Sequence, residues 1–149
     1  MGTQEGLLVS PKIFRNFIKP HLAKHAQLAR RYGIKVMLHS CGAIREIIPD
    51  LIEIGVDILN PVQARARDMN PAELKRAFGN KLSFHGSMDI QRTLPLGTVE
   101  DVRAEVRDRV QTLGKGGGFI LCSTHNIQAD TSLENILAMY DEAKKMAMS

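Results

Sequence analysis

A histidine and a cysteine stand two residues apart where an apolar run ends, in the segment Lys35-Val-Met-Leu-His-Ser-Cys-Gly42. Residues i and i+2 of an extended segment point to the same side, so His39 and Cys41 can offer an imidazole nitrogen and a thiolate sulfur to one metal ion. A third ligand would come from the last apolar run, which ends in Cys122 and is followed by His125. Three such ligands with an open fourth position are typical of a catalytic zinc, which binds a thiol and lowers its pKa. The residue types alone favour a plainer interpretation, in which the cysteine is a small buried hydrophobe and His39 a hydrogen-bonded core histidine.

Further polar side chains follow the other apolar runs that we expect to be strands. The carboxyl ends of parallel strands meet at one edge of a sheet, where ligands bind in both open and closed α/β folds. We therefore expect these side chains to contact a substrate: Asn60, Gln63, His85, Asp89, Asn126 and Gln128. Asp89 could orient His85 for proton transfer, although a capping or turn role for Asp89 is at least as well supported. No Gly-rich phosphate loop follows the first run, so a dinucleotide site is not expected.

Short apolar runs alternate with helical patterns along the chain. The runs at 34–38, 56–59, 82–85 and 119–122 predict four strands, and the first reads as a strand buried on both faces. Helices are predicted from Ser10-Pro11 to near Gly33, with a kink or break at Pro20, and over 44–52, 71–78 and 98–113. The last helix follows 130–132, and its apolar side is predicted to carry Leu133, Ile136, Leu137, Tyr140 and Ala143.

A glycine closes each of the first four helical patterns just before a strand: Gly33, Gly55, Gly79 and Gly114. Helices that alternate with short apolar strands at this spacing predict an α/β fold with a parallel sheet.

Length and charge set the class of protein. The 149 residues are enough for one domain, 1–149, with a hydrophobic core. The net charge of +4 comes from scattered basic residues, which gives no case for nucleic acid. The absence of a signal-peptide pattern and of long apolar stretches predicts a cytoplasmic chain with reduced thiols and no membrane span.

An ordered series of motifs runs over nearly the whole chain: Gly2-Thr-Gln4, His39-Ser-Cys-Gly42, Gly55-Val-Asp-Ile-Leu-Asn-Pro-Val-Gln63, Phe84-His-Gly-Ser-Met-Asp89, Gly117-Gly-Phe-Ile-Leu121, His125-Asn-Ile-Gln128 and Glu134-Asn135-Ile136. Together they resemble the carboxyl-terminal half of the uroporphyrinogen decarboxylase superfamily. The resemblance implies a (βα)8 barrel of the TIM type, of which this chain supplies about half. It also implies one of two activities, porphyrinogen decarboxylation or methyl transfer from a methylated corrinoid to a thiol.

The His-x-Cys turn marks the methyltransferases of the superfamily, in which it supplies two of three zinc ligands. His39 and Cys41 match it, and the third ligand of those enzymes, a cysteine, aligns with His125, three residues after Cys122. Decarboxylases carry a histidine at that position. The resemblance therefore leaves three alternatives: a triad of His39, Cys41 and His125, a triad completed by Cys122, or no zinc.

The resemblance makes zinc-dependent methyl transfer the expected function, with a corrinoid protein as a possible partner. The alternatives are a lyase-type decarboxylation of a tetrapyrrole in porphyrin biosynthesis, and a non-catalytic half-barrel that binds a tetrapyrrole or a partner chain. The arginine and aspartate residues on which the decarboxylases rely belong to the other half of the barrel. Because half a barrel would leave open strand edges, we expect a homodimer or association with an amino-terminal half.

Overall fold

Four parallel strands form one sheet in the order β1-β2-β3-β4 in a computed structural model, which describes residues 1–147. The strands are β1 (Met37–His39), β2 (Ile58–Asn60), β3 (Ser83–Met88) and β4 (Phe119–Ser123). Each strand pairs with the next one along the chain, as expected when a helix connects successive parallel strands. The predicted α/β fold with a parallel sheet is confirmed, with strand bounds displaced by no more than three residues.

The helices include two irregular turns. They are α1 (Pro11–Ile13), the π-helical η1 (Phe14–Ile18), α2 (Lys19–Arg31), the 3-10 turn η2 (Arg45–Ile47), α3 (Ile48–Ile54), α4 (Pro71–Phe78), α5 (Thr93–Leu96), α6 (Val99–Leu113) and α7 (Leu133–Ala147). The predicted break at Pro20 is confirmed, because α2 begins one residue before this proline and the backbone before it widens into the π turn. The short α5 was not predicted.

Side-chain caps mark the starts of α1, α4 and α6. The Ser10 hydroxyl accepts from the Ile13 N–H, and the Asn70 side chain accepts from the N–H groups of Ala72 and Glu73. Thr98 and Asp101 form a capping box at the start of α6, as their spacing predicts.

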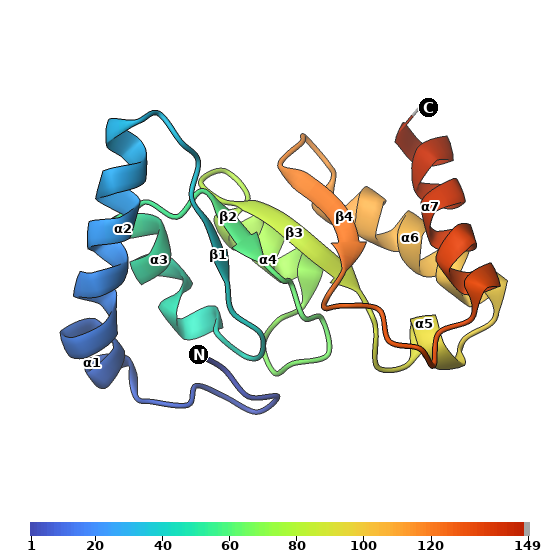
Figure 1. The fold of residues 1–149 in the computed structure, drawn as a ribbon, viewed down its shortest axis with the longest axis horizontal. Helices are drawn as coiled ribbons and strands as arrows, with labels where there is room; N and C mark the ends of the chain where they lie inside the picture. Colours follow the sequence, from blue (N-terminus) through green and yellow to red (C-terminus); the bar gives the residue numbers. More distant parts are fainter. Residues whose placement is uncertain (148–149) are drawn as a thin grey trace.

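Helices cover one face of the sheet. In Figure 1, α4 and α6 lie behind the strands, while α2 and α7 stand at opposite ends and the near face of the sheet carries no helix. Leu59 and Phe84 point to the covered face and are fully buried with Leu74 and Leu113. The core therefore lies between the sheet and its outer helices.

The uncovered face corrects one prediction. β1 is not buried on both faces, since the Met37 side chain is 52% exposed, and Ile120 of β4 is 46% exposed. The continuous apolar run at 34–38 is typical of a strand inside a closed barrel. The inner side of this strand is therefore only partly covered.

The apolar side predicted for α7 is only partly buried. Ala143 of that side packs against the core, but Leu133, Leu137 and Tyr140 are exposed, and the buried residues of the helix are Asn135, Ala138, Met139 and Glu142. The Asn135 amide donates to the carbonyls of Leu94 and Gly97, and Glu142 pairs with Arg103 and Arg107 of α6. Polar groups with specific partners thus decide which face of α7 packs on α6.

No helix among residues 1–147 is long and apolar enough to cross a bilayer.

Candidate functional site

A row of hydrogen-bonded side chains crosses the carboxyl ends of β1, β2 and β3 on the inner face of the sheet. In the strand register, His39 of β1 lies opposite Asn60 of β2. On the other side of β2, Leu59 lies opposite Phe84 of β3, and Asn60 and His85 are the residues that follow this pair. The His39 Nδ1 lies 2.5 Å from Asn60 Oδ1, and Asn60 Nδ2 lies 2.6 Å from His85 Nδ1. The amide of Asn60 therefore joins two imidazoles that lie 46 residues apart in the sequence.

Cys41 lies beside the outer imidazole of this row. Its Sγ is 3.4 Å from His39 Nε2. In a tetrahedral zinc site with bonds of about 2.1 Å to nitrogen and about 2.3 Å to sulfur, the two ligand atoms are about 3.6 Å apart. The His39 and Cys41 atoms are thus already spaced as two ligands of one zinc ion.

His125 lies next to this pair. Its ring centre is 6.0 Å from that of His39, with the planes at 78°. Two imidazoles on one tetrahedral ion have ring centres roughly 5 Å apart, so His125 needs to approach by about 1 Å. Cys41 and His125 line the same cavity, of ≈ 360 Å³. Within residues 1–147 no three His, Cys, Asp or Glu side chains are yet close enough together to hold a metal.

Cys122 lies with a different histidine. Its Sγ is 3.2 Å from His85 Nδ1 and 3.1 Å from the Ser123 carbonyl oxygen, to which the thiol donates. Its register partner is Ser87 of β3, whereas His39 lies two strands away from β3, on β1. The structure thus brings His39, Cys41 and His125 together and places Cys122 with His85.

Burial controls the protonation of these groups. It raises the pKa of the Cys122 thiol and lowers the pKa of His85. Burial also raises the pKa of Cys41, although the positive charge of the amino terminus opposes this effect. Both thiols are therefore protonated at neutral pH, and a bound cation would be needed to hold Cys41 as a thiolate.

Hydrogen bonds to Gln63 and Thr3 stabilise the turn that carries Cys41. The Gly42 N–H donates to Gln63 Oε1 at 2.8 Å, and the Ala43 N–H donates to the Thr3 carbonyl at 2.7 Å. Gly42 has a φ of 88°, and a Cβ there would lie 2.4 Å from the Gly2 carbonyl carbon. This contact explains why glycines occur in both the Gly2-Thr-Gln4 and His39-Ser-Cys-Gly42 motifs, a link that the separate motifs do not reveal.

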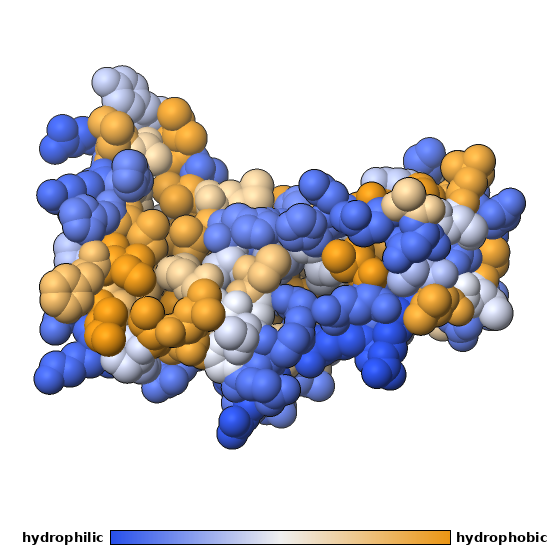
Figure 2. Space-filling model, turned by 60° about the horizontal axis from the view of Figure 1, so that its bottom comes forward, coloured by the Kyte–Doolittle hydropathy of each residue, from blue (hydrophilic) through white to orange (hydrophobic). Residues whose placement is uncertain are grey.

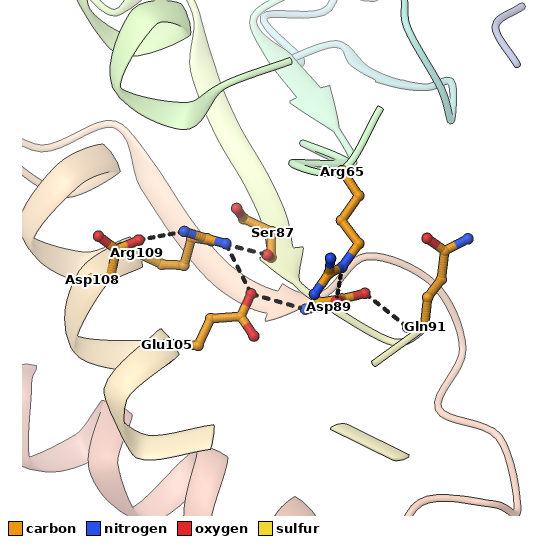
Figure 3. A network of polar contacts seen from close by, with 7 residues as sticks. All are labelled: Arg65, Ser87, Asp89, Gln91, Glu105, Asp108 and Arg109. Atoms are coloured by element: carbon orange, nitrogen blue, oxygen red, sulfur yellow. Dashed lines mark hydrogen bonds and ion pairs between the residues drawn. The ribbon is translucent and has the colours of Figure 1, made fainter. Parts of the chain in front are cut away.

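Asp89 belongs to a separate ionic network and has no contact with His85 among the described residues. Figure 3 shows Asp89 paired with Arg65, while its other oxygen accepts from the Gln91 N–H at 2.8 Å. The Asp89 N–H donates to Glu105 Oε1, which also accepts from Arg109 Nη2 at 2.9 Å. Asp89 thus orders the loop after β3, and Glu105 and Arg109, which sequence reasoning missed, complete the network from α6.

This network lines a second cavity, of ≈ 500 Å³, which shares Gln63, Gln91 and Thr124 with the first. The two cavities therefore lie side by side along the carboxyl edge of the sheet.

Asn126 and Gln128 are exposed beyond β4. The Gln128 amide donates to the Asn126 carbonyl and the Gln128 carbonyl accepts from the Thr131 N–H, so both hydrogen bonds lie within their own loop. Their expected role in substrate binding stays a prediction.

Comparison with known proteins identifies relatives of this chain. The family model described as uroporphyrinogen decarboxylase (URO-D) matches residues 3–146. A methylated-thiol–coenzyme M methyltransferase of Methanosarcina mazei is 27% identical over 139 residues, which is 93% of this chain and 34% of that protein. The solved structure of a methyltransferase from Methanosarcina mazei superposes with a TM-score of 0.77 at 26% identity, over 94% of this chain and 39% of that one. The chain thus spans between a third and two fifths of these relatives.

Proposed function

Because the chain belongs to the uroporphyrinogen decarboxylase family and forms half of its (βα)8 barrel, we propose that it carries the zinc site of a methyltransferase that moves a methyl group from a methylated corrinoid to a thiol. The observation that carries the proposal is the pair of His39 Nε2 and Cys41 Sγ, 3.4 Å apart at the carboxyl edge of the sheet. The methylated-thiol–coenzyme M methyltransferase among its relatives supports the thiol as acceptor.

His39, Cys41 and His125 would hold the zinc. His125 is preferred to Cys122 as the third ligand because His125 lies against the His39 ring, whereas the Cys122 thiol contacts His85. When bound, zinc supplies a positive charge that keeps the acceptor thiol ionised at neutral pH.

The remaining polar residues would shape the site around the zinc. Gln63 holds the turn of Cys41 through the Gly42 N–H, and both Gln63 and Cys41 line the 360 Å³ cavity. His85 and Asn60 lie on the same inner face of the sheet as His39. A methylated corrinoid, held by a separate corrinoid protein, would approach this face from the side that no helix covers, and a small thiol would enter the cavity.

Zinc content of the purified protein tests the proposal. We expect one zinc per chain, and we expect His39→Ala and Cys41→Ser to lose it because each removes one of three ligands. His125→Ala should also lose the metal, whereas Cys122→Ser should retain it. His21→Ala, at an exposed position of α2, is the control that should bind as the unmodified protein does.

Two results would overturn the proposal. One is a protein without stoichiometric zinc after purification in zinc-containing buffer. The other is a His39→Ala variant that holds as much zinc as the His21→Ala control.

Decarboxylation of a tetrapyrrole is the second candidate function. It is favoured by His125, which stands where the decarboxylases carry a histidine and whose exposed side chain lines the cavity. This alternative expects metal-free protein to bind uroporphyrinogen and His125→Ala to weaken that binding, with Cys41→Ser unchanged. Uroporphyrinogen binding that requires zinc and is weakened by Cys41→Ser would reject this alternative.

A further inference from the structure

We propose that Asn60 is a positioning residue that fixes opposite tautomers on two neutral imidazoles, so that His39 carries its ring proton on Nδ1 and His85 carries its ring proton on Nε2. The tautomers follow from the orientation of the Asn60 amide, whose Oδ1 faces His39 and whose Nδ2 faces His85. Their meaning for metal binding rests on the proposed zinc site.

The asymmetry of the amide carries the inference. An amide oxygen can only accept a hydrogen bond and an amide nitrogen can only donate one. Because Asn60 Oδ1 lies 2.5 Å from His39 Nδ1, that nitrogen must carry the proton. Because Asn60 Nδ2 lies 2.6 Å from His85 Nδ1, that nitrogen must be the acceptor. One side chain thus imposes different tautomers on its two neighbours.

In a neutral His39 ring the Cys41 thiol can then donate to the lone pair of Nε2. This atom lies 3.4 Å from Cys41 Sγ, so it faces the sulfur with which it would share a metal. Metal-binding histidines usually donate their other N–H to a carbonyl or carboxylate, which fixes the ring and raises its basicity. Here Asn60 Oδ1 is the acceptor for the Nδ1–H of His39.

For His85 the consequence is an uncharged hydrogen-bond donor. Its Nδ1 is occupied by the Asn60 N–H, and burial lowers the pKa of the ring, so the imidazole is neutral and its proton lies on Nε2. The Cys122 sulfur lies 3.2 Å from Nδ1 and 3.8 Å from Nε2, and its thiol donates to the Ser123 carbonyl, so it does not compete with Asn60 for the Nδ1 lone pair. A neutral N–H on the inner face of the sheet suits an anionic substrate group such as a thiolate or a carboxylate.

Substitution of Asn60 separates its two hydrogen bonds. A carboxylate accepts from both sides, so Asn60→Asp should leave His39 protonated on Nδ1 and move the His85 proton from Nε2 to Nδ1. Asn60→Leu removes both hydrogen bonds at similar volume, and should leave His39 without its fixed tautomer. Asn80→Leu changes an exposed asparagine in the turn after α4, outside the row, and serves as the control.

Nitrogen-15 NMR of the five histidine rings reads the tautomers directly in metal-free protein, with each ring assigned from a single His→Gln variant. We expect the Nδ1–H form for His39 and the Nε2–H form for His85 in the unmodified protein, the switch at His85 alone in Asn60→Asp, and no change in Asn80→Leu. The opposite pair of tautomers in the unmodified protein, or an unchanged His85 in Asn60→Asp, would overturn the inference.

Zinc titration then distinguishes this inference from the proposed function. We expect Asn60→Leu to weaken zinc binding roughly 10- to 100-fold, as loss of a partner behind a ligand does, and Asn60→Asp to bind within a few-fold of the unmodified protein. Correct tautomers without zinc binding would reject the zinc site and leave the inference standing. Zinc binding that is equally tight in Asn60→Leu would reject the positioning role and leave the zinc site standing.

Discussion

Two features of Ser87 destabilise the folded protein. Its backbone has a φ of 82°, in the left-handed region, although it lies within β3. Its side chain is fully buried, and its hydroxyl has no hydrogen-bond partner among the described residues. A strained non-glycine backbone costs on the order of 1–3 kcal/mol, and an unpaired buried hydroxyl costs roughly 1–3 kcal/mol.

Ser87→Gly should therefore stabilise the protein. Glycine adopts a positive φ without strain and removes the hydroxyl, while its greater freedom in the unfolded chain offsets part of the gain, which leaves about 1–2 kcal/mol in the free energy of unfolding. Urea denaturation followed by circular dichroism measures the change. Ser87→Ala removes the hydroxyl but keeps the strained backbone, so its gain should be smaller. A Ser87→Gly protein less stable than the unmodified one would contradict this account.

At the scale of elements, a buried carboxylate ties the first helices to α3. The carboxylate of Asp50 in α3 accepts hydrogen bonds from Arg15 Nε at 3.1 Å and from Lys19 Nζ at 2.8 Å. The Asp50 side chain is only 7% exposed. Burial by itself would raise the pKa of Asp50, but the hydrogen bonds from Arg15 and Lys19 outweigh burial and hold the pKa below its ordinary value. The packing of α2 on α3 thus depends on a charged Asp50.

Asp50→Asn should destabilise the protein by about 1–3 kcal/mol at pH 7, because it leaves two cations without their shared partner. Since the folded pKa is lowered, the stabilisation is fully present above the unfolded pKa of about 3.9 and is lost as the pH falls through the folded pKa. The difference between the two proteins should be constant from pH 5 to 8 and shrink below about pH 4.

Urea denaturation at a series of pH values checks this dependence. Asp141→Asn, at an exposed position of α7, is the control that should change little. A difference that persists undiminished at the lowest pH would show that the charge of Asp50 is not what stabilises the α2–α3 contact.

At the scale of the whole molecule, apolar side chains remain exposed at both ends of the sheet. Figure 2 shows hydrophilic residues across the middle of the loop face, hydrophobic residues gathered at the end that carries α1, and a hollow between the two ends. Ile13, Phe17 and Met37 are exposed near the β1 end, and Leu133, Leu137 and Tyr140 are exposed on α7. Nothing among residues 1–147 pairs with the outer edges of β1 and β4.

This arrangement predicts association of the isolated chain. Two copies, or this chain and an amino-terminal half, would bury both apolar ends and pair the open edges. Gel filtration with light scattering should report about twice the monomer mass of 16.5 kDa for the chain alone. Phe17→Glu with Leu137→Glu places a charge at each end and should shift the protein to monomer with unchanged circular dichroism. A well-folded monomer without these substitutions would reject the prediction.

Local signals in the sequence were sufficient for the elements. The caps at Asn70 and Thr98, the break at Pro20 and the alternation of helices with apolar runs each depend on residues within a few positions of one another. The same is true of His39 and Cys41, whose spacing predicts that they lie together. The parallel α/β fold and the order of its elements followed from these local patterns.

Only the tertiary structure decided what the elements contact. The register of β1, β2 and β3 brings His39, Asn60 and His85 into one row, and the pairing of β4 with β3 places Cys122 beside His85. The loops after β2 and β3 bring Arg65 to Asp89. Likewise the partners of Asn135 and Glu142, and not the apolar pattern of α7, select its buried face. The physical reason is that hydrogen bonds and packing between residues 20 to 45 positions apart depend on strand register and helix rotation, which the local periodicity of a sequence leaves open.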